Sequence, residues 1–131
     1  MSRATAVRLD LGALVHNLQR VRATAPGRKV AAAVKANGYG HGLVRVARVL
    51  DADAFAVASI EEALILREAG IARPILLLEG VFAATELPLC ARHHLEIAVH
   101  HPEQARMLEQ ARLERPVRVW LKLDTGMHRL G

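Results

Sequence analysis

The most informative stretch of the chain is Ala33-Val34-Lys35-Ala36-Asn37-Gly38-Tyr39-Gly40-His41-Gly42. An apolar run ends at Lys35, and glycines separated by a tyrosine and a histidine follow it. The run predicts a buried strand and the glycines predict a loop, so the lysine stands where a rigid element opens into a pocket. Glycines at such a place let the backbone approach a ligand closely. A lysine amine there becomes nucleophilic when burial or a neighbouring cation lowers its pKa, as Schiff-base chemistry requires.

Apolar segments alternate with turn residues along the rest of the chain. An apolar stripe that follows Asp10 as its N-cap predicts a first helix. Ser59 and Glu62 fit a capping box at the start of another helix, which Gly70 ends. In full, we expect strands over 5–9, 29–35, 54–58, 74–78, 95–99 and 117–123, and helices over 11–23, 43–50, 60–69, 85–92 and 102–113. This alternation predicts an α/β fold with parallel strands joined by right-handed crossovers.

Two architectures fit the alternation: a doubly wound open sheet and a parallel (β/α)₈ barrel. The glycines at 38, 40 and 42 miss the G-x-G-x-x-G spacing of the open sheet's phosphate-binding turn, so we expect the barrel. Counted from residue 29, the chain supplies about five of its eight strands. We therefore expect an incomplete barrel, with unpaired edges that favour aggregation or partial disorder. The strand over 29–35 is apolar nearly throughout, which predicts that both of its faces are covered.

Composition narrows the class of protein. The chain has 131 residues, of which 52% are hydrophobic and 24% charged, as in a soluble globular domain. The net charge is +5, but the arginines are scattered and aromatic residues make up only 3%, so we expect no nucleic-acid partner. No apolar run is long enough to span a membrane, and we expect no membrane partner. Cys90 is the single cysteine, which excludes an internal disulfide and suits a cytoplasmic protein; no metal site is expected.

A second candidate site segment runs from Lys122 to Gly131 and reads Lys-Leu-Asp-Thr-Gly-Met-His-Arg-Leu-Gly. Residues 117–124, which lead into this segment and overlap its first residues, alternate between apolar and polar side chains. In a barrel the apolar set points outward to the helices, so Lys122 points inward. The same parity places Lys35 on the inner face. Both lysines are thus expected at the C-terminal ends of parallel strands, where barrel enzymes carry out their chemistry.

These two segments resemble motifs of the alanine racemases, a family that depends on pyridoxal 5'-phosphate. The nonapeptide from Val34 resembles the family's lysine motif, and the decapeptide from Lys122 resembles K-x-D-[ST]-G-M-x-R-x-G. Similar segments lie at 55–63, 66–70 and 74–80, so the resemblance covers essentially the whole chain.

The resemblance implies a role for each residue of the site. Lys35 would hold the cofactor as a Schiff base and act as the catalytic base on the D-alanine side. Tyr39 would bind the cofactor phosphate, and Arg129 would contact both the cofactor's phenolic oxygen and the substrate carboxylate. Lys122 would be carbamylated. The last point agrees with electrostatics, because an unmodified lysine beside Arg129 would place two cations together, whereas a carbamate attracts the guanidinium.

The implied reaction interconverts L-alanine and D-alanine, either to supply D-alanine for peptidoglycan or to serve alanine catabolism. In the family the second base is a tyrosine from the C-terminal β-domain of the partner subunit, so a homodimer is expected for the full-length protein. We expect residues 1–131 to be the N-terminal part of the cofactor-binding barrel domain, without the β-domain. On their own they are expected to bind the cofactor weakly and to be inactive.

Other interpretations of these residues remain open. The protein could be a broad-specificity amino-acid racemase of the same fold, because the residues that limit the substrate pocket in the family lie largely beyond 131. It could also be a non-catalytic barrel protein that binds pyridoxal phosphate, although such a protein would not need Lys122 and Arg129. Lys35 alone could be an ordinary lysine at a strand end, and Arg129 a surface arginine. Asp124 to Gly126 could simply form an Asx turn.

Overall fold

The structure is a computed structural model that describes residues 4–131. Its centre is a parallel sheet in which every strand pairs with its neighbour in sequence, in the order β1-β2-β3-β4-β5. The strands are β1 (Ala31–Ala33), β2 (Ala54–Val57), β3 (Ile75–Leu77), β4 (Leu95–Val99) and β5 (Val119–Leu121). The prediction of parallel strands that alternate with helices is therefore confirmed. The strands from residue 29 onward are all present; β4 has the expected bounds, and the others are shorter than expected.

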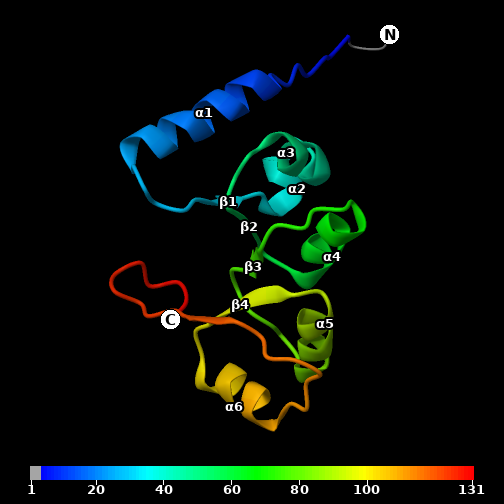
Figure 1. Cartoon of the computed structure of the whole chain (residues 1–131), viewed down its shortest axis with the longest axis vertical. Helices are drawn as coiled ribbons and strands as arrows, with labels where there is room; N and C mark the ends of the chain where they lie inside the picture. The colour runs from blue at the N-terminus through cyan, green and yellow to red at the C-terminus, as the bar shows by residue number, and fades with distance from the viewer. Residues whose placement is uncertain (1–3) are drawn as a thin grey trace.

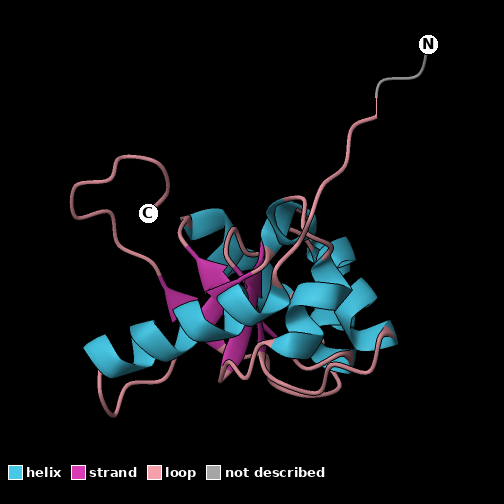
Figure 2. Ribbon diagram, turned by 90° about the horizontal axis from the view of Figure 1, so that it is seen from above, coloured by secondary structure: helices cyan, strands magenta, loops and turns pink. Residues whose placement is uncertain are grey.

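One helix precedes the first strand, and the other helices connect consecutive strands. They are α1 (Leu11–Thr24), α2 (Lys35–Tyr39), α3 (Leu43–Val49), α4 (Ile60–Glu68), the 3₁₀ turn η1 (Ala84–Glu86), α5 (Leu87–Arg92) and α6 (Pro102–Gln110). Figure 1 shows α3, α4 and α5 on one side of the sheet. The C-terminal loop lies on the other side, which is also evident from above in Figure 2. None of the helices within residues 4–131 combines the length and apolarity that a membrane crossing requires.

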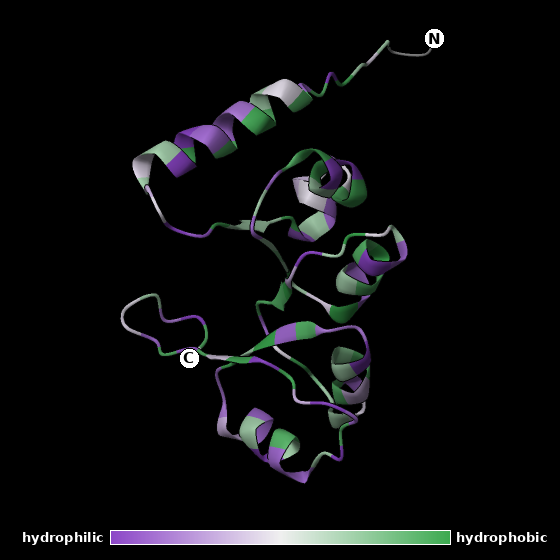
Figure 3. Ribbon diagram, viewed as in Figure 1, coloured by the Kyte–Doolittle hydropathy of each residue, from purple (hydrophilic) through white to green (hydrophobic). Residues whose placement is uncertain are grey.

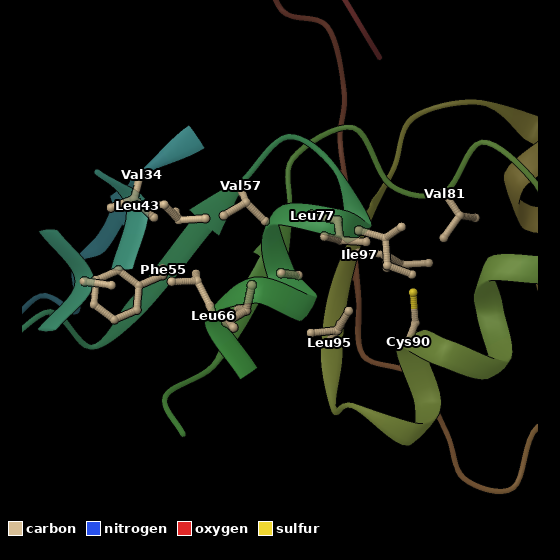
Figure 4. Close-up of a cluster of buried hydrophobic side chains, with 14 of the residues drawn as sticks. Val34, Leu43, Phe55, Val57, Leu66, Leu77, Val81, Cys90, Leu95 and Ile97 are labelled. Carbon is tan, nitrogen blue, oxygen red and sulfur yellow. The ribbon is translucent and has the colours of Figure 1, made fainter. Parts of the chain in front are cut away.

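The hydrophobic core fills the space between the sheet and the helices. Figure 4 shows side chains of the strands meeting side chains of the helices in this layer. Phe55, Ile75, Leu77 and Ile97 are completely buried. On the helical side, Leu43, Val46, Ile60, Leu66, Leu87 and Cys90 belong to the same cluster. Burial raises the pKa of the Cys90 thiol to about 11, so this cysteine serves as a small apolar residue of the core.

The opposite, inner face of the sheet follows from the strand register. Ala33 pairs with Ala56, Ala56 with Leu76, and Leu76 with Glu96, so these residues share one face. Ala31 and Ala33 are exposed, although both faces of their strand were expected to be covered. That expectation is wrong for residues 4–131, because the helices cover only the outer face.

Helix α1 begins as the sequence predicts. Asp10 is its N-cap, and its Oδ1 accepts a hydrogen bond from Ala13 N at 3.0 Å. The helix lies at one end of the molecule (Figure 1), with Leu14 and Leu18 packed against the core. No residue of α1 is fully buried. Figure 3 shows hydrophilic and hydrophobic residues mixed along this helix, in keeping with its partial contact.

Several predicted boundaries are wrong. Residues 5–9 form no strand, because they are almost wholly exposed and no neighbouring strand supplies ladder hydrogen bonds. Helix α6 ends at Gln110 instead of residue 113, and Ala111 is already extended. Pro116 disfavours helix just before it, and the chain must return to β5. Glu62 also departs from the capping box, because its carboxylate bonds to Ala36 N and Ala58 N.

Candidate active site

Lys35 lies directly beyond the C-terminal end of β1. The ladder with β2 continues to Val34, whose N–H donates to Ala56 O at 2.9 Å. Lys35 follows Ala33 on the inner face by strand parity, and its side chain is half-buried. A rigid strand thus carries the amine to the rim of the sheet, as the sequence predicts.

The chain then makes a left-handed turn, which was predicted only as a glycine-rich loop. Ala36, Asn37 and Gly38 have φ values of 53°, 55° and 61°, and Tyr39 has a φ of 53°. A left-handed backbone costs roughly 1–2 kcal/mol for each residue that has a Cβ. Gly38 avoids this cost, and its lack of a Cβ also leaves room for Val46, whose side chain a Cβ would approach to 3.1 Å. Asn37 Oδ1 accepts from Leu43 N at 2.9 Å, which joins the turn to α3.

Lys122 is the counterpart of Lys35 at the other edge of the sheet. Val119 pairs with the core residue Ile97, and Trp120 pairs with Ala98, so the predicted inward parity of Lys122 is confirmed. Lys122 N donates to Val99 O at 2.9 Å, which keeps this residue in the ladder. The apolar face of β5 was expected to pack on helices. Instead Leu121 is 74% exposed, because no helix within residues 4–131 covers this face.

The loop after β5 is held together by Asp124. Its Oδ1 accepts from Gly126 N at 2.9 Å and from His128 N at 3.0 Å, which confirms the expected Asx-type turn. These backbone N–H groups hold the pKa of the Asp124 carboxyl below its usual value. His128 Nδ1 lies 3.0 Å from Asp124 Oδ2. Met127 in the same loop is 68% exposed.

One cavity joins the two edges of the sheet. It has a volume of about 250 Å³ and is lined by Lys35, Leu78, Glu79, Lys122, Arg129 and Leu130. Three of the four predicted site residues therefore meet: the candidate Schiff-base lysine, the second lysine and the arginine. Tyr39 is not part of the lining and is 60% exposed. An adjoining cavity of about 380 Å³ shares Arg129 and adds His100, Asp124 and His128.

Sequence reasoning missed two acidic residues near this site. Glu79 lines the cavity, and nothing in the sequence distinguished it from any residue after a strand. Glu62 bonds to the peptide that follows Lys35, with Oε1 2.7 Å from Ala36 N. The contact was not predicted because Glu62 lies in a Ser-x-x-Glu pattern, and this pattern predicts a local capping role for its side chain.

Comparison with known protein families agrees with the placement of Lys35, Lys122 and Arg129 around one cavity. A model of the family described as alanine racemase, N-terminal domain, matches residues 9–131. The chain belongs to the alanine racemase family. The alanine racemase of Pectobacterium carotovorum is 59% identical over 132 residues, and the biosynthetic alanine racemase of Escherichia coli O6:H1 is 60% identical over 129. These alignments cover 100% and 98% of this chain and 36% of each relative.

Solved structures give the same result for the fold. The crystal structure of biosynthetic alanine racemase from Pseudomonas aeruginosa superposes with a TM-score of 0.90 at 46% identity. The match covers 94% of this chain and 35% of that one. The parallel strands and their helices are thus part of an alanine racemase barrel, and the choice of a barrel over a doubly wound sheet is confirmed. The chain spans about a third of the length of the racemases it matches.

Proposed function

We propose that this chain provides the lysine-bearing side of an alanine racemase active site, in which L-alanine and D-alanine are interconverted. The observation that carries the proposal is the shared cavity of Lys35, Lys122 and Arg129. Lys35 follows the strand at one edge of the sheet, and Lys122 and Arg129 follow the strand at the other edge, so the meeting of Lys35 with the other two is a property of the fold and not of sequence proximity. Membership of the family supports the same reaction.

The residues around the cavity suit pyridoxal 5'-phosphate. A primary amine at Lys35 can bond to an aldehyde, while the Arg129 guanidinium favours an anionic ligand. Leu78 and Leu130 add apolar surface for an aromatic ring. When bound, this cofactor supplies an electron sink for the negative charge that develops as the α-proton of alanine leaves.

Each side chain then has a separate task. Lys35 Nζ holds the cofactor and, once released, accepts the α-proton on the D-alanine side as an uncharged amine or returns it as an ammonium group. The Arg129 guanidinium holds the substrate carboxylate through paired N–H donors. Exchange in both directions needs a second base on the opposite face of the substrate, which we propose to be the tyrosine that the family takes from its partner subunit.

Two assignments depend on the family resemblance alone. Lys122 is proposed to be carbamylated, so that it attracts the Arg129 guanidinium instead of repelling it. Tyr39 is proposed to bind the cofactor phosphate. It stands on the turn after Lys35 and is 60% exposed, so core packing does not explain its position. We also propose a homodimeric assembly, alanine as the substrate and a cytoplasmic location, with a role in D-alanine supply or alanine catabolism.

The decisive experiment measures conversion of L-alanine to D-alanine by the purified protein with added pyridoxal phosphate. We expect activity in the protein that also carries the second base, and its loss in Lys35→Ala, because this substitution removes the amine that we propose holds the cofactor and moves the α-proton. Borohydride reduction followed by peptide mapping should place the cofactor on Lys35. Turnover that persists in Lys35→Ala would refute the proposal.

Serine and lysine are the comparison substrates. Racemisation of alanine alone supports an alanine racemase, whereas similar rates with all three would identify a broad-specificity racemase. A cofactor bound at Lys35 without turnover of any of them would identify a non-catalytic binding protein.

A further inference from the structure

The turn that follows Lys35 needs external support. Ala36, Asn37 and Tyr39 each have a Cβ and a positive φ near 55°. Such residues keep a left-handed backbone only where the surrounding structure holds it in place. Within the turn, Gly38 N donates to Val34 O at 2.8 Å and Gly40 N donates to Ala36 O at 3.0 Å. These local bonds close the turn, but they do not fix its orientation relative to the rest of the sheet.

Glu62 supplies a link from a separate part of the chain. It stands in the first turn of α4, and its Oε1 accepts from Ala36 N at 2.7 Å. Its other oxygen, Oε2, accepts from Ala58 N at 2.9 Å, just beyond the end of β2. The carboxylate thus bridges the C-terminal ends of β1 and β2. A carboxylate suits this place because both of its oxygens only accept, and both partners only donate.

The position of Glu62 itself is fixed by α4. Ser59 is the N-cap of this helix, and its side chain accepts from Glu62 N at 3.5 Å. The side chain of Glu62 is therefore free of the reciprocal capping bond to the backbone of Ser59 and can reach across to Ala36. A helix that packs on the core through Ile60, Ala63 and Leu66 gives the bridge a rigid base.

The bond to Ala36 N acts directly on Lys35. The Ala36 N–H and the Lys35 carbonyl belong to one planar peptide group, so holding this N–H fixes the ψ angle of Lys35. The strand ladder holds the backbone before Lys35 and Glu62 holds the peptide after it, so the Cα of Lys35 and the direction of its Cα–Cβ bond are restrained from both sides. We propose that Glu62 is a positioning residue that aims Lys35 Nζ into the cavity it shares with Arg129. This inference rests on the proposed function of Lys35 as the cofactor lysine.

The test compares Glu62→Gln with Glu61→Gln. Both remove one negative charge from the first turn of α4, but Glu61 is exposed and has no bond to the Lys35 turn. In Glu62→Gln an amide N–H₂ must face one of the two backbone N–H donors, so one of the bonds is lost. Glu62→Asp retains the charge but is shorter by one methylene, so it cannot span both donors. It serves as the second variant if Glu62→Gln folds poorly.

Two measurements do not depend on turnover. Hydrogen exchange at the Ala36 amide should accelerate on the order of tenfold in Glu62→Gln and Glu62→Asp, as the loss of a charge-assisted hydrogen bond predicts. The rate at which Lys35 bonds to pyridoxal phosphate, followed by absorbance and borohydride trapping, should fall by a similar factor. In the active protein kcat should fall while KM for alanine changes little. Glu61→Gln should match the unsubstituted protein throughout.

The outcomes separate this inference from the proposed function. Unchanged Ala36 exchange and unchanged Lys35 reactivity in Glu62→Gln and Glu62→Asp would overturn the positioning role. An unsubstituted protein that never bonds to pyridoxal phosphate at Lys35 would overturn the proposed function instead. Faster Ala36 exchange with unchanged Lys35 reactivity would show that Glu62 only stabilises the turn, and this too would overturn the inference.

Discussion

Lys35 and Arg129 line one cavity, although they follow the strands at opposite edges of the sheet. Lys35 comes directly after β1, and Arg129 belongs to the loop after β5. Two facts bring them together: parallel strands end at the same rim, and the twist of a sheet turns its edges toward each other. The site therefore depends on every strand pairing between β1 and β5, because any lost pairing would separate its two halves.

Replacing Arg129 should weaken the binding of alanine more than it slows the chemical step. Arg129→Lys keeps the positive charge but loses the planar pair of donors that matches a carboxylate. We expect KM for alanine to rise roughly tenfold or more, with a smaller change in kcat. Steady-state racemase kinetics provide the measurement, and Arg112→Lys, at an exposed arginine outside the cavity, is the control. An unchanged KM would show that Arg129 does not bind the substrate carboxylate.

A carbamate on Lys122 should be directly visible. Protein equilibrated with ¹³C-bicarbonate should show a carbamate carbon signal that disappears in Lys122→Arg, because an arginine side chain does not form this adduct at neutral pH. The same substitution should lower activity, since it places two guanidinium groups at one cavity. A high-resolution crystal structure with a bare amine at Lys122 would contradict carbamylation.

The features that could be predicted from the sequence are those set by short-range patterns. The alternation of apolar runs and turn residues predicted parallel strands joined by helices. The alternation of side chains at 117–124 predicted that Lys122 points inward. Asp10 and Ser59 were recognisable as helix caps because a cap needs only a few neighbouring residues.

Features that depend on residues distant in sequence could not be predicted in this way. The contact between Glu62 and Ala36 joins the first turn of α4 to the turn after β1, and no local pattern distinguishes it from a capping box. The strand expected at 5–9 has a good strand composition but no partner strand within residues 4–131. The left-handed turn is another case, because three of its residues adopt a backbone that their own preferences oppose.

Acid should loosen the loop that carries Arg129. The N–H groups of His128 and Gly126 lower the pKa of Asp124 below its ordinary value of 3.8. A carboxyl whose pKa is depressed by folding stabilises the loop above its unfolded-state pKa, and this contribution disappears as the pH falls through the folded-state pKa. Carboxyl-carbon NMR should give a midpoint for Asp124 below 3.8 in the native protein and a higher one in denaturant.

The amide signals of Gly126 and His128 should shift at the same native midpoint, because both donate to Asp124 Oδ1. In Asp124→Asn these shifts should be absent. Equal midpoints for Asp124 in the native and denatured protein would show that these bonds do not favour the charged form.

A matched pair of glycines tests how closely β4 approaches the segment after β3. A Cβ on Gly80 would overlap Ala98 O and stand 2.7 Å from Gln104 Nε2, whereas a Cβ on Gly70 would meet open space. Both glycines have positive φ, 71° and 82°, so both alanine variants carry a similar backbone penalty of about 1–2 kcal/mol. Gly80→Ala should cost clearly more, because backbone must also move. Urea unfolding measures the difference, and equal costs would contradict the close approach.

Glu96 should hold β5 against β4. Its side chain is 13% exposed, and its two oxygens accept from Arg118 Nη1 at 2.8 Å and from Trp120 Nε1 at 2.7 Å. Glu96→Gln can still accept one of these bonds but leaves the other donor unpaired, so we expect a loss of about 1–2 kcal/mol. Arg118 is 72% exposed, so Arg118→Ala should cost less than about 1 kcal/mol.

Trp120 is the single tryptophan, so its fluorescence during urea unfolding reports directly on β5. The control is Glu109→Gln, which removes the same charge from an exposed position on α6. The fluorescence midpoint should fall in Glu96→Gln and stay unchanged in Glu109→Gln. If the two variants unfold alike, Glu96 does not anchor β5, and the placement of Lys122 must depend on the backbone ladder with Val99 alone.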